Sequence, residues 1–368
     1  MLTSGTPTMP KLLTKFPDFS DPAASRPDAG AYSPDLYMSV ADVGGVPPDD
    51  PAPGSSAPPS GPTGHGGVGV VGVAVTGNQG IDGLFCGLAW NATTITYSFP
   101  ASASFYGSGY GSGAGQYPDP APFNGFAQLS AQQQGEVQRA LGLITSYTGL
   151  TFTQVAESAT THAVLRFADS SSPSTSYAYL PNATTPAGDV FYGGTGRNPV
   201  QGNFDSGQAI FHEINHAMGM KDAGATYSYG ATPANIRDIE YSVGNYANYI
   251  GSTAPFGTAG SGSSEQSYMM YDIAAYQAMY GVNFGKTGTS QTYTFSPTTG
   301  QMFINGVSQG TPYNNHIFET IWTGGATATY DFSNFNTNGT LDLRPGMPVK
   351  FSAPQLADLG YWSNWGRG

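Results

Sequence analysis

The stretch FHEINHAMGMKD, residues 211–222, decides what kind of protein this sequence describes. Within it, His212 and His216 are four residues apart, and Glu213 directly follows the first histidine. On a helix, residues four apart lie one above the other on one face, so we expect the two imidazoles to point at a common spot. Two neutral imidazoles suit a borderline ion such as Zn²⁺. The stretch therefore predicts a helix that carries a metal site.

The residues around the two histidines add a base and a third ligand. Glu213 is not placed to bind the same ion, but it can accept a proton from an attacking water, as the glutamate of the H-E-x-x-H motif of metalloproteases does. Gly219 can adopt the left-handed backbone that ends a helix and reverses the chain. That turn would bring Asp222 back under the metal. Because no histidine occurs between 217 and 315, we expect this carboxylate as the third ligand.

A bare H-E-x-x-H match has a second interpretation, a helix surface with two solvated histidines. The apolar residues of the same helix argue against that interpretation, since they predict a buried helix rather than a solvated one. The chain also has only 5 histidines, and two of them fall in this motif. The apolar residues are Ile210, Phe211, Ile214 and Met218.

Composition excludes several classes of partner. Of the 368 residues only 10% are charged, and acids outnumber bases 24 to 12, which gives a formal net charge of −12. This balance argues against nucleic acid or an anionic membrane as a partner. No apolar run approaches membrane-spanning length, and the N-terminus lacks the apolar core of a secretory signal peptide. Cys86 is the single cysteine, so no internal disulfide can form, and we expect it to be a small buried apolar residue.

The pattern along the chain predicts three parts. Residues 1–66 are rich in Pro, Ala, Ser, Gly and Asp and are expected to be a disordered leader or propeptide. Residues 67–285 mix strands and helices, and residues 286–368 carry only strand patterns. We expect strands at 93–100, 150–155, 162–168, 188–194, 291–297, 301–306, 316–322, 328–335 and 341–344, a weaker one at 67–75, and helices at 130–150, 206–218 and 272–281.

The extended motif resembles that of the serralysin family of metzincin zinc endopeptidases, H-E-x-x-H-x-x-G-x-x-H, with Asp222 in the last place. The resemblance covers about 81–343. YSVGNY, residues 241–246, is similar to the family's Met-turn, and YDIAAYQAMYG, residues 271–281, is similar to the helix that closes its catalytic domain. The resemblance implies an α+β fold, in which a twisted, mostly parallel sheet and a zinc helix form the catalytic domain. A small all-β C-terminal domain would follow.

The resemblance also implies roles for residues that match. His212 and His216 would bind zinc together with Asp222, and Glu213 would be the base. Tyr246 would bind zinc in the resting enzyme and then stabilise the oxyanion. GDVFYGG, residues 188–194, would be the edge strand along which substrate lies, so that Gly188, Val190 and Tyr192 would bind substrate by strand pairing.

The chain departs from the family pattern at several positions. Gly244 stands in place of the methionine of the Met-turn, and we expect Met269 or Met270 to fill the space. Asn215 replaces a glycine of the motif, which is a mild change on a helix. Thr323 and Ala328 stand where the family carries Asp, and the Ca²⁺-binding repeats are absent. Zn²⁺ is therefore the expected cofactor, and the residues give Ca²⁺ binding little support.

The sequence thus predicts a zinc metalloendopeptidase that acts on protein or peptide substrates. We expect a monomer, without nucleic-acid or membrane partners, that is secreted by a route the sequence does not identify. Two alternatives remain open. One is a catalytically weak or inactive binding protein on a metzincin scaffold, which Gly244 favours and Glu213 and Tyr246 oppose. The other is a metal-dependent hydrolase of a non-peptide substrate.

Overall fold

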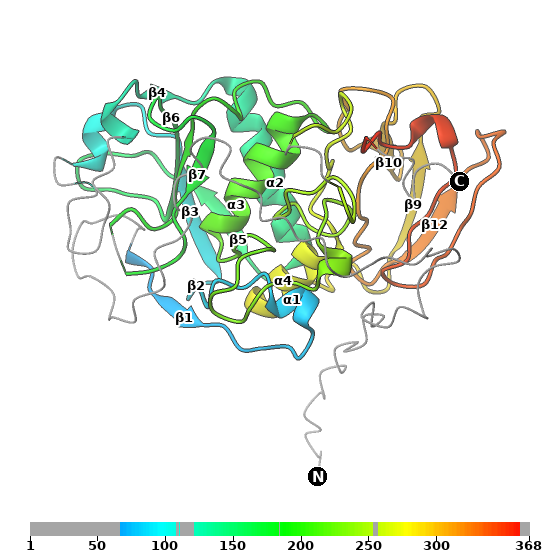
Figure 1. The fold of residues 1–368 in the computed structure, drawn as a ribbon, viewed down its shortest axis with the longest axis horizontal. Helices are drawn as coiled ribbons and strands as arrows, with labels where there is room; N and C mark the ends of the chain where they lie inside the picture. Colours follow the sequence, from blue (N-terminus) through cyan, green and yellow to red (C-terminus); the bar gives the residue numbers. More distant parts are fainter. Residues whose placement is uncertain (1–66, 108–109, 111–120, 184, 253–256, 361–368) are drawn as a thin grey trace, which may run out of the picture.

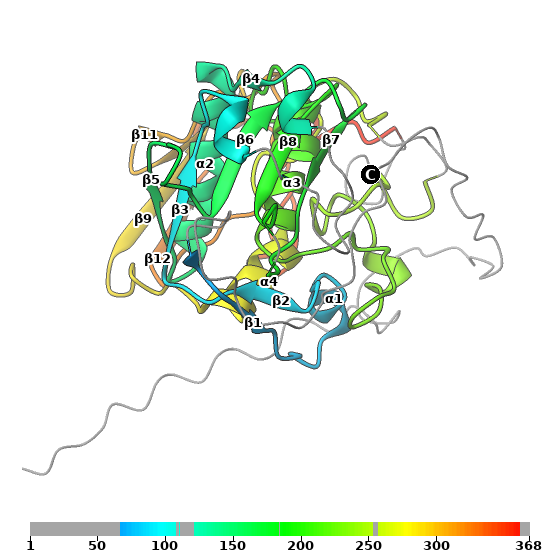
Figure 2. The same cartoon turned by 90° about the vertical axis from the view of Figure 1, so that its left-hand side faces the viewer.

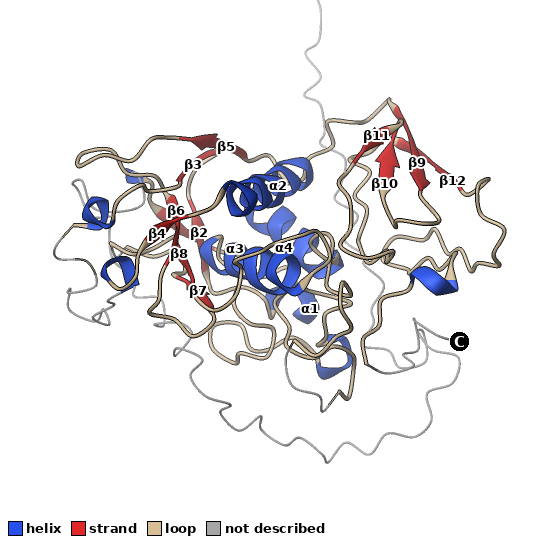
Figure 3. Cartoon of the chain, turned by 90° about the horizontal axis from the view of Figure 1, so that it is seen from above, coloured by secondary structure: helices blue, strands red, loops and turns tan. Residues whose placement is uncertain are grey.

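The fold is described from a computed structural model over residues 67–107, 110, 121–183, 185–252 and 257–360 (Figure 1). The predicted leader, residues 1–66, lies outside the described residues. A six-stranded sheet occupies one part of the molecule, a smaller four-stranded sheet occupies another, and the main helices lie between them in Figures 1 and 3. This is the mixed α and β architecture that the sequence predicts.

The main sheet is mostly parallel. Its order is β5 (Thr151–Gln154), β3 (Thr94–Ser98), β6 (Leu165–Asp169), β8 (Asp189–Tyr192) and β7 (Ser176–Ala178), with β4 (Ala127–Gln128) also paired to β6. Figure 2 shows β5, β3, β6, β8 and β7 in this order from left to right. The pairs β3–β5, β3–β6 and β6–β8 are parallel, whereas β7 runs antiparallel to β8. Parallel strands are buried on both faces, which is consistent with the full burial of β6 and β8.

One expectation about this sheet is wrong. The segment 188–194 forms β8, but β8 pairs with β6 on one side and with β7 on the other, so it is an inner strand. The edge strand on this side of the sheet is β7, and β5 lies at the opposite edge. The sequence signal failed because apolar continuity marks a strand that is buried on both faces, and an edge strand can be short and polar.

The helices form as their sequences predict, with local differences. The helix α2 (Ala131–Tyr147) begins at a capping box, in which Ser130 accepts from the backbone of Gln133 and the Gln133 side chain accepts from the backbone of Ser130. Its predicted apolar face is buried. The helix α4 (Met270–Tyr280) ends at Gly281, as expected. The buried residues of the apolar face of α2 are Val137, Leu141, Ile144 and, just past the end of α2, Thr148.

The zinc-motif helix differs from the regular α-helix expected over 206–218. It begins with a π-helical turn, Asp205–Phe211, and continues as the short helix α3 (His212–Ala217), which packs against β7 and β8. Gly207, in the π-helical turn, lies close to the backbone of Glu265. A Cβ added at Gly207 would lie 2.8 Å from the carbonyl oxygen of Glu265. Wide π turns are frequent at functional sites, where they re-aim side chains.

The remaining strands form two small sheets. β1 (Val70–Gly72) and β2 (Leu88–Trp90) pair antiparallel and flank the short helix α1 (Gln79–Asp82). The second sheet has the order β11 (Val307–Ser308), β10 (Met302–Ile304), β9 (Ser290–Phe295) and β12 (Thr327–Asp331). The strands expected at 316–322 and 341–344 are wrong, since those segments are loops. Whether residues 286–368 form a separate domain stays a prediction.

Candidate metal centre

The two motif histidines converge as predicted. Both lie on α3 and are buried, with exposed fractions of 3% for His212 and 5% for His216. Their Nε2 atoms are 3.0 Å apart, and the rings are nearly perpendicular. One turn of helix separates the two residues, which places both rings on the same side of the helix.

The chain after the helix reverses at Gly219 and returns Asp222 to the histidines. Gly219 has φ +107°, and a Cβ there would lie 2.5 Å from the carbonyl oxygen of Leu88, so only glycine fits this turn. Asp222 Oδ1 lies 3.3 Å from Nε2 of His212 and 3.6 Å from Nε2 of His216. The turn that the sequence predicts therefore brings the carboxylate to the two imidazoles.

A buried lysine holds this returning segment in place. The Lys221 side chain is 1% exposed and lies over the ring of Tyr227, and its ammonium donates hydrogen bonds to the carbonyl oxygens of Gly83, Ala225 and Gly230. Its backbone N–H donates to the carbonyl of Leu84 at 2.7 Å. A buried charge is tolerated when it is fully hydrogen-bonded. This anchoring fixes the backbone immediately before Asp222, a role that the sequence did not indicate.

The hydrogen bonds behind the histidines define where their lone pairs point. Nδ1 of His212 lies 2.7 Å from the carbonyl oxygen of Val243, and Nδ1 of His216 lies 2.9 Å from that of Met220. Because a carbonyl oxygen only accepts, each neutral imidazole carries its hydrogen on Nδ1. Both Nε2 lone pairs therefore face the same small volume. Without a cation between them, this arrangement would be repulsive.

The spacing of the three donor atoms fits a zinc ion. Zinc bound at about 2.0–2.1 Å in a tetrahedral site requires ligand atoms about 3.3–3.4 Å apart. The three separations here are 3.0, 3.3 and 3.6 Å. Among the described residues, His212, His216 and Asp222 are the group of three whose donor atoms could hold a metal. In addition, Asp222 Oδ1 is buried and, apart from the two Nε2 atoms, has no polar partner among the described residues, which is expected of an atom reserved for a cation.

The electrostatics of the centre also favour a positive charge at this point. Burial alone would lower the pKa of His212, but the hydrogen bond and charge of Asp222 outweigh it and raise that pKa to about 10. Burial opposes ionisation of Asp222 as well, yet His212 and His216 hold its pKa below the usual range. Both shifts favour a positive charge at the point where the three groups meet.

The predicted base lies beside the ligands in the same pocket. Glu213 is 6% exposed, and its Oε2 is buried without a hydrogen-bond partner among the described residues. Burial raises the pKa of Glu213, an effect that the two neighbouring imidazoles oppose. Tyr246 is 40% exposed, and its hydroxyl donates to Asp222 Oδ2 at 2.9 Å. The pocket is lined by Thr175, Ser176, Thr195, Phe204, Gln208, His212, Glu213 and Tyr246.

Whether Met269 or Met270 replaces the Met-turn methionine stays a prediction. The atoms nearest to a Cβ built on Gly244 are Ser242 Oγ at 3.2 Å, the Lys221 carbonyl oxygen at 3.6 Å and Leu84 Cδ2 at 4.0 Å. The turn therefore lies against the segment that leads to Asp222, to which it is also joined by the hydrogen bond from Ala223 N–H to the Gly244 carbonyl oxygen.

The pocket wall opposite the zinc helix comes from the true edge strand. Backbone bonds from Gly193 N to the Thr175 oxygen and from Tyr179 N to the Asp189 oxygen fix the pairing of β7 with β8. Since strand residues alternate, the N–H and C=O groups of Ser176 and Ala178 face away from β8. Gly188, Val190 and Tyr192 belong to the inner strand or its start, and Val190 and Tyr192 are fully buried. They are therefore not placed to pair with a substrate.

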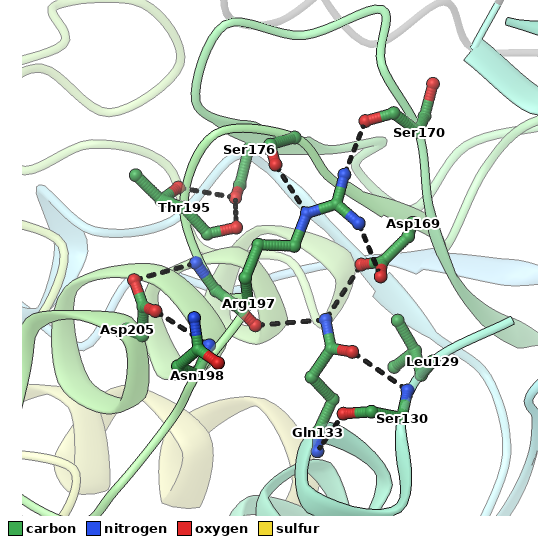
Figure 4. A network of polar contacts seen from close by, with 12 residues as sticks. Leu129, Ser130, Gln133, Asp169, Ser170, Ser176, Thr195, Arg197, Asn198 and Asp205 are labelled. Atoms are coloured by element: carbon green, nitrogen blue, oxygen red, sulfur yellow. Dashed lines mark hydrogen bonds and ion pairs between the residues drawn. The ribbon is translucent and has the colours of Figure 1, made fainter. Parts of the chain in front are cut away.

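A polar network fixes the segment that follows β8 along this wall (Figure 4). Arg197 pairs with Asp169 at 2.5 Å and donates to the carbonyl oxygens of Ser170 and Gly193. Thr195 and Ser176 join their hydroxyl groups at 2.7 Å. These bonds tie the loop that contains Thr195 to the main sheet, of which Ser176 is a part.

Comparison with known proteins places the site in a class. No family model matches the chain. The chain is 27% identical over 239 residues to the metallopeptidase AprA of Pseudomonas marginalis, which covers 60% of this chain and 48% of that protein. It is 26% identical over 279 residues to the metalloprotease AprA of Pseudomonas entomophila, covering 70% and 54%. The chain is thus similar to bacterial metalloproteases.

The similarity extends to proteins named for one family. The chain is 26% identical over 246 residues to serralysin A of Dickeya chrysanthemi, which covers 64% of this chain and 48% of that protein. The resemblance to serralysin-like metalloproteases that the sequence predicts is confirmed. The chain spans about half the length of the curated relatives it matches.

Proposed function

We propose that this protein is a zinc-dependent endopeptidase whose metal is held by His212, His216 and Asp222. The observation that carries the proposal is the convergence of three buried donor atoms at zinc spacing. A carboxylate oxygen of Glu213 that has no hydrogen-bond partner among the described residues lies in the same pocket. A pure binding protein would not need a buried base at this place. The similarity to proteins named metalloproteases and serralysins supports the same reaction.

The chain's own residues divide the work of peptide hydrolysis. Zinc, when bound, supplies a Lewis acid that polarises the scissile carbonyl and lowers the pKa of the attacking water. Glu213 takes the proton of that water and passes it to the leaving amine. Tyr246 offers a phenol donor at the mouth of the pocket, where it stabilises the negative charge that develops on the carbonyl oxygen. Its bond to Asp222 shows that the hydroxyl already reaches the ligand set.

The substrate backbone is proposed to pair with β7 rather than with the predicted segment 188–194. The outward backbone groups of Ser176 and Ala178 offer the hydrogen bonds of one added strand, and Ser176 also lines the pocket beside the metal ligands. An extended peptide on this edge would carry its scissile bond past Glu213. This geometry favours protein or peptide substrates over compact small molecules.

The finer parts of the sequence prediction are retained as proposals. Residues 67–285 would form the catalytic unit, and residues 286–368 a β-rich unit without the Ca²⁺-binding repeats of the family. Action outside the cell and a monomeric state rest on the resemblance alone. Among the described residues, no helix is both long and apolar enough to cross a membrane.

A chelator-sensitive proteolysis assay tests the proposal. Purified protein should bind one zinc per chain and cleave casein, and a metal chelator should abolish cleavage until zinc is restored. Glu213→Ala should lose the activity, whereas Glu240→Ala, which changes a half-buried glutamate outside the pocket, should keep it. Zinc binding without proteolysis would favour the inactive-scaffold alternative. Full activity of Glu213→Ala would refute the assigned base.

A further inference from the structure

A buried carboxylate at the start of α4 joins the zinc helix to the turn at 242–244. Asp272 is 0% exposed and accepts the Asn215 side-chain amide at 2.9 Å and the Ser242 hydroxyl at 2.7 Å, both on Oδ1. Its Oδ2 accepts the backbone N–H of Val243 at 2.9 Å and that of Met269 at 2.9 Å. One carboxylate therefore holds three segments that are distant in the sequence.

The Asn215 side chain is fixed at both ends. It is 1% exposed, its amide donates to Asp272, and its Oδ1 accepts the Tyr276 hydroxyl at 2.8 Å. Asn215 directly precedes the ligand His216 on α3. The expectation that an asparagine here is a mild helix substitution is thus incomplete, because its side chain spans from the zinc helix to two residues of α4.

The same network reaches the other histidine through two hydrogen bonds. Asp272 fixes the N–H of Val243, and the carbonyl oxygen of Val243 lies 2.7 Å from Nδ1 of His212. Ser242 Oγ also accepts the N–H of Gly244 at 3.0 Å, so the turn is held although Gly244 carries no side chain. Groups that orient a ligand from behind typically change metal affinity by about 10–100-fold when they are removed.

We propose that Asn215 is a positioning residue for the metal centre: through Asp272 it locks the zinc helix to the 242–244 turn, and so fixes the two imidazoles at the separation that binds zinc. This inference rests on the proposed function, since it requires the metal site. In this proposal the hydrogen-bond network around Asp272 supplies the rigidity that a side chain at position 244 would otherwise supply. Asn215 touches neither the metal nor the substrate, so its effect must appear first in metal affinity.

Competition for zinc against a fluorescent chelator measures this effect directly. Asn215→Ala should weaken zinc binding by about tenfold or more, since it removes the donor to Asp272. Asn283→Ala is the matched control. Asn283 lies just beyond the C-terminal end of α4, and its side-chain amide donates to the carbonyl oxygen of Thr145 in α2 rather than to the zinc helix. The control should bind zinc within about twofold of the parent. A parent that binds no zinc would refute the proposed function itself.

A double-mutant cycle separates positioning from simple stabilisation. Asn215 and Ser242 donate to the same oxygen of Asp272, so the losses of zinc affinity in Asn215→Ala and Ser242→Ala should be clearly non-additive in the double variant. If Asn215→Ala lowers the melting temperature but binds zinc within about twofold of the parent, Asn215 is only structural and the inference is overturned.

Tyr276→Phe keeps the test decisive if Asn215→Ala does not fold. This variant removes only the hydroxyl that orients the Asn215 amide. It should weaken zinc binding by about threefold or more, which corresponds to part of the free energy of one hydrogen bond. Unchanged zinc affinity in a folded Tyr276→Phe protein would overturn the inference.

Discussion

Replacing the buried lysine next to the third ligand tests how the metal loop is held. In Lys221→Met the four-carbon stem is largely conserved, while the ammonium is lost. The carbonyl oxygens of Gly83, Ala225 and Gly230 then lose their donor. The first of these bonds is buried, and the other two are partly buried. Water can therefore reach the last two carbonyls more easily than the first.

The expected destabilisation of Lys221→Met follows from the loss of these three hydrogen bonds. A buried carbonyl that loses its partner costs about 1–3 kcal/mol, and a partly hydrated one costs less. The variant also avoids the desolvation of an ammonium, which offsets part of the loss. We expect a net destabilisation of about 3 kcal/mol, at the upper end of single substitutions. Because Asp222 follows directly, the metal loop should loosen and zinc affinity should fall with stability.

Urea unfolding of the metal-free and the zinc-loaded protein, followed by tryptophan fluorescence, measures both effects. The free energy of unfolding should fall by about 3 kcal/mol without zinc, and by more with zinc present. Lys286→Met, at a half-buried lysine, should change it by less than about 0.5 kcal/mol. If Lys221→Met unfolds at the same urea concentration as the parent in both states, the ammonium does not hold the loop.

Four further outcomes follow from the site and the core. Burial raises the pKa of Glu265 to about 8, so between about pH 4.5 and pH 8 the folded chain keeps a proton that the unfolded chain has lost. The free energy of unfolding should therefore fall as the pH rises through this range. In urea titrations from about pH 5 to 8.5, Glu265→Gln should make this fall smaller. Glu213→Gln should reduce kcat at least ~10²-fold with zinc content unchanged, and a lower zinc content would contradict its role as the base. Tyr246→Phe should reduce kcat about 10²-fold with KM unchanged, and a raised KM would contradict its role in stabilising the oxyanion. Ala178→Pro removes an outward N–H of the edge strand and should lower kcat/KM for peptides about tenfold in a folded protein, whereas an unchanged kcat/KM would show that substrate does not pair there.

Local signals made much of the fold predictable. The capping box at Ser130 and Gln133 located the start of α2, and Gly281 located the end of α4. The strands β3, β5, β6 and β8 coincide with β-branched or apolar runs. In each case neighbouring residues decide the structure, so the pattern alone is sufficient.

What escaped prediction depends on contacts between distant segments. The edge strand β7 is three residues long and lies in a serine-rich stretch, so no alternation of useful length marked it. The convergence of His212, His216 and Asp222 could be predicted because helix geometry and one glycine turn determine it. The partners of Lys221 and Asn215 could not, because they lie up to 138 residues away in the sequence.

The most direct test is a crystal structure of the zinc-loaded protein with anomalous data collected at the zinc edge. A single strong peak should lie within about 2.0–2.2 Å of Nε2 of His212, Nε2 of His216 and a carboxylate oxygen of Asp222. A zinc-loaded crystal with no peak at these atoms, or with Asp222 turned away from the ion and no group in its place, would contradict the account.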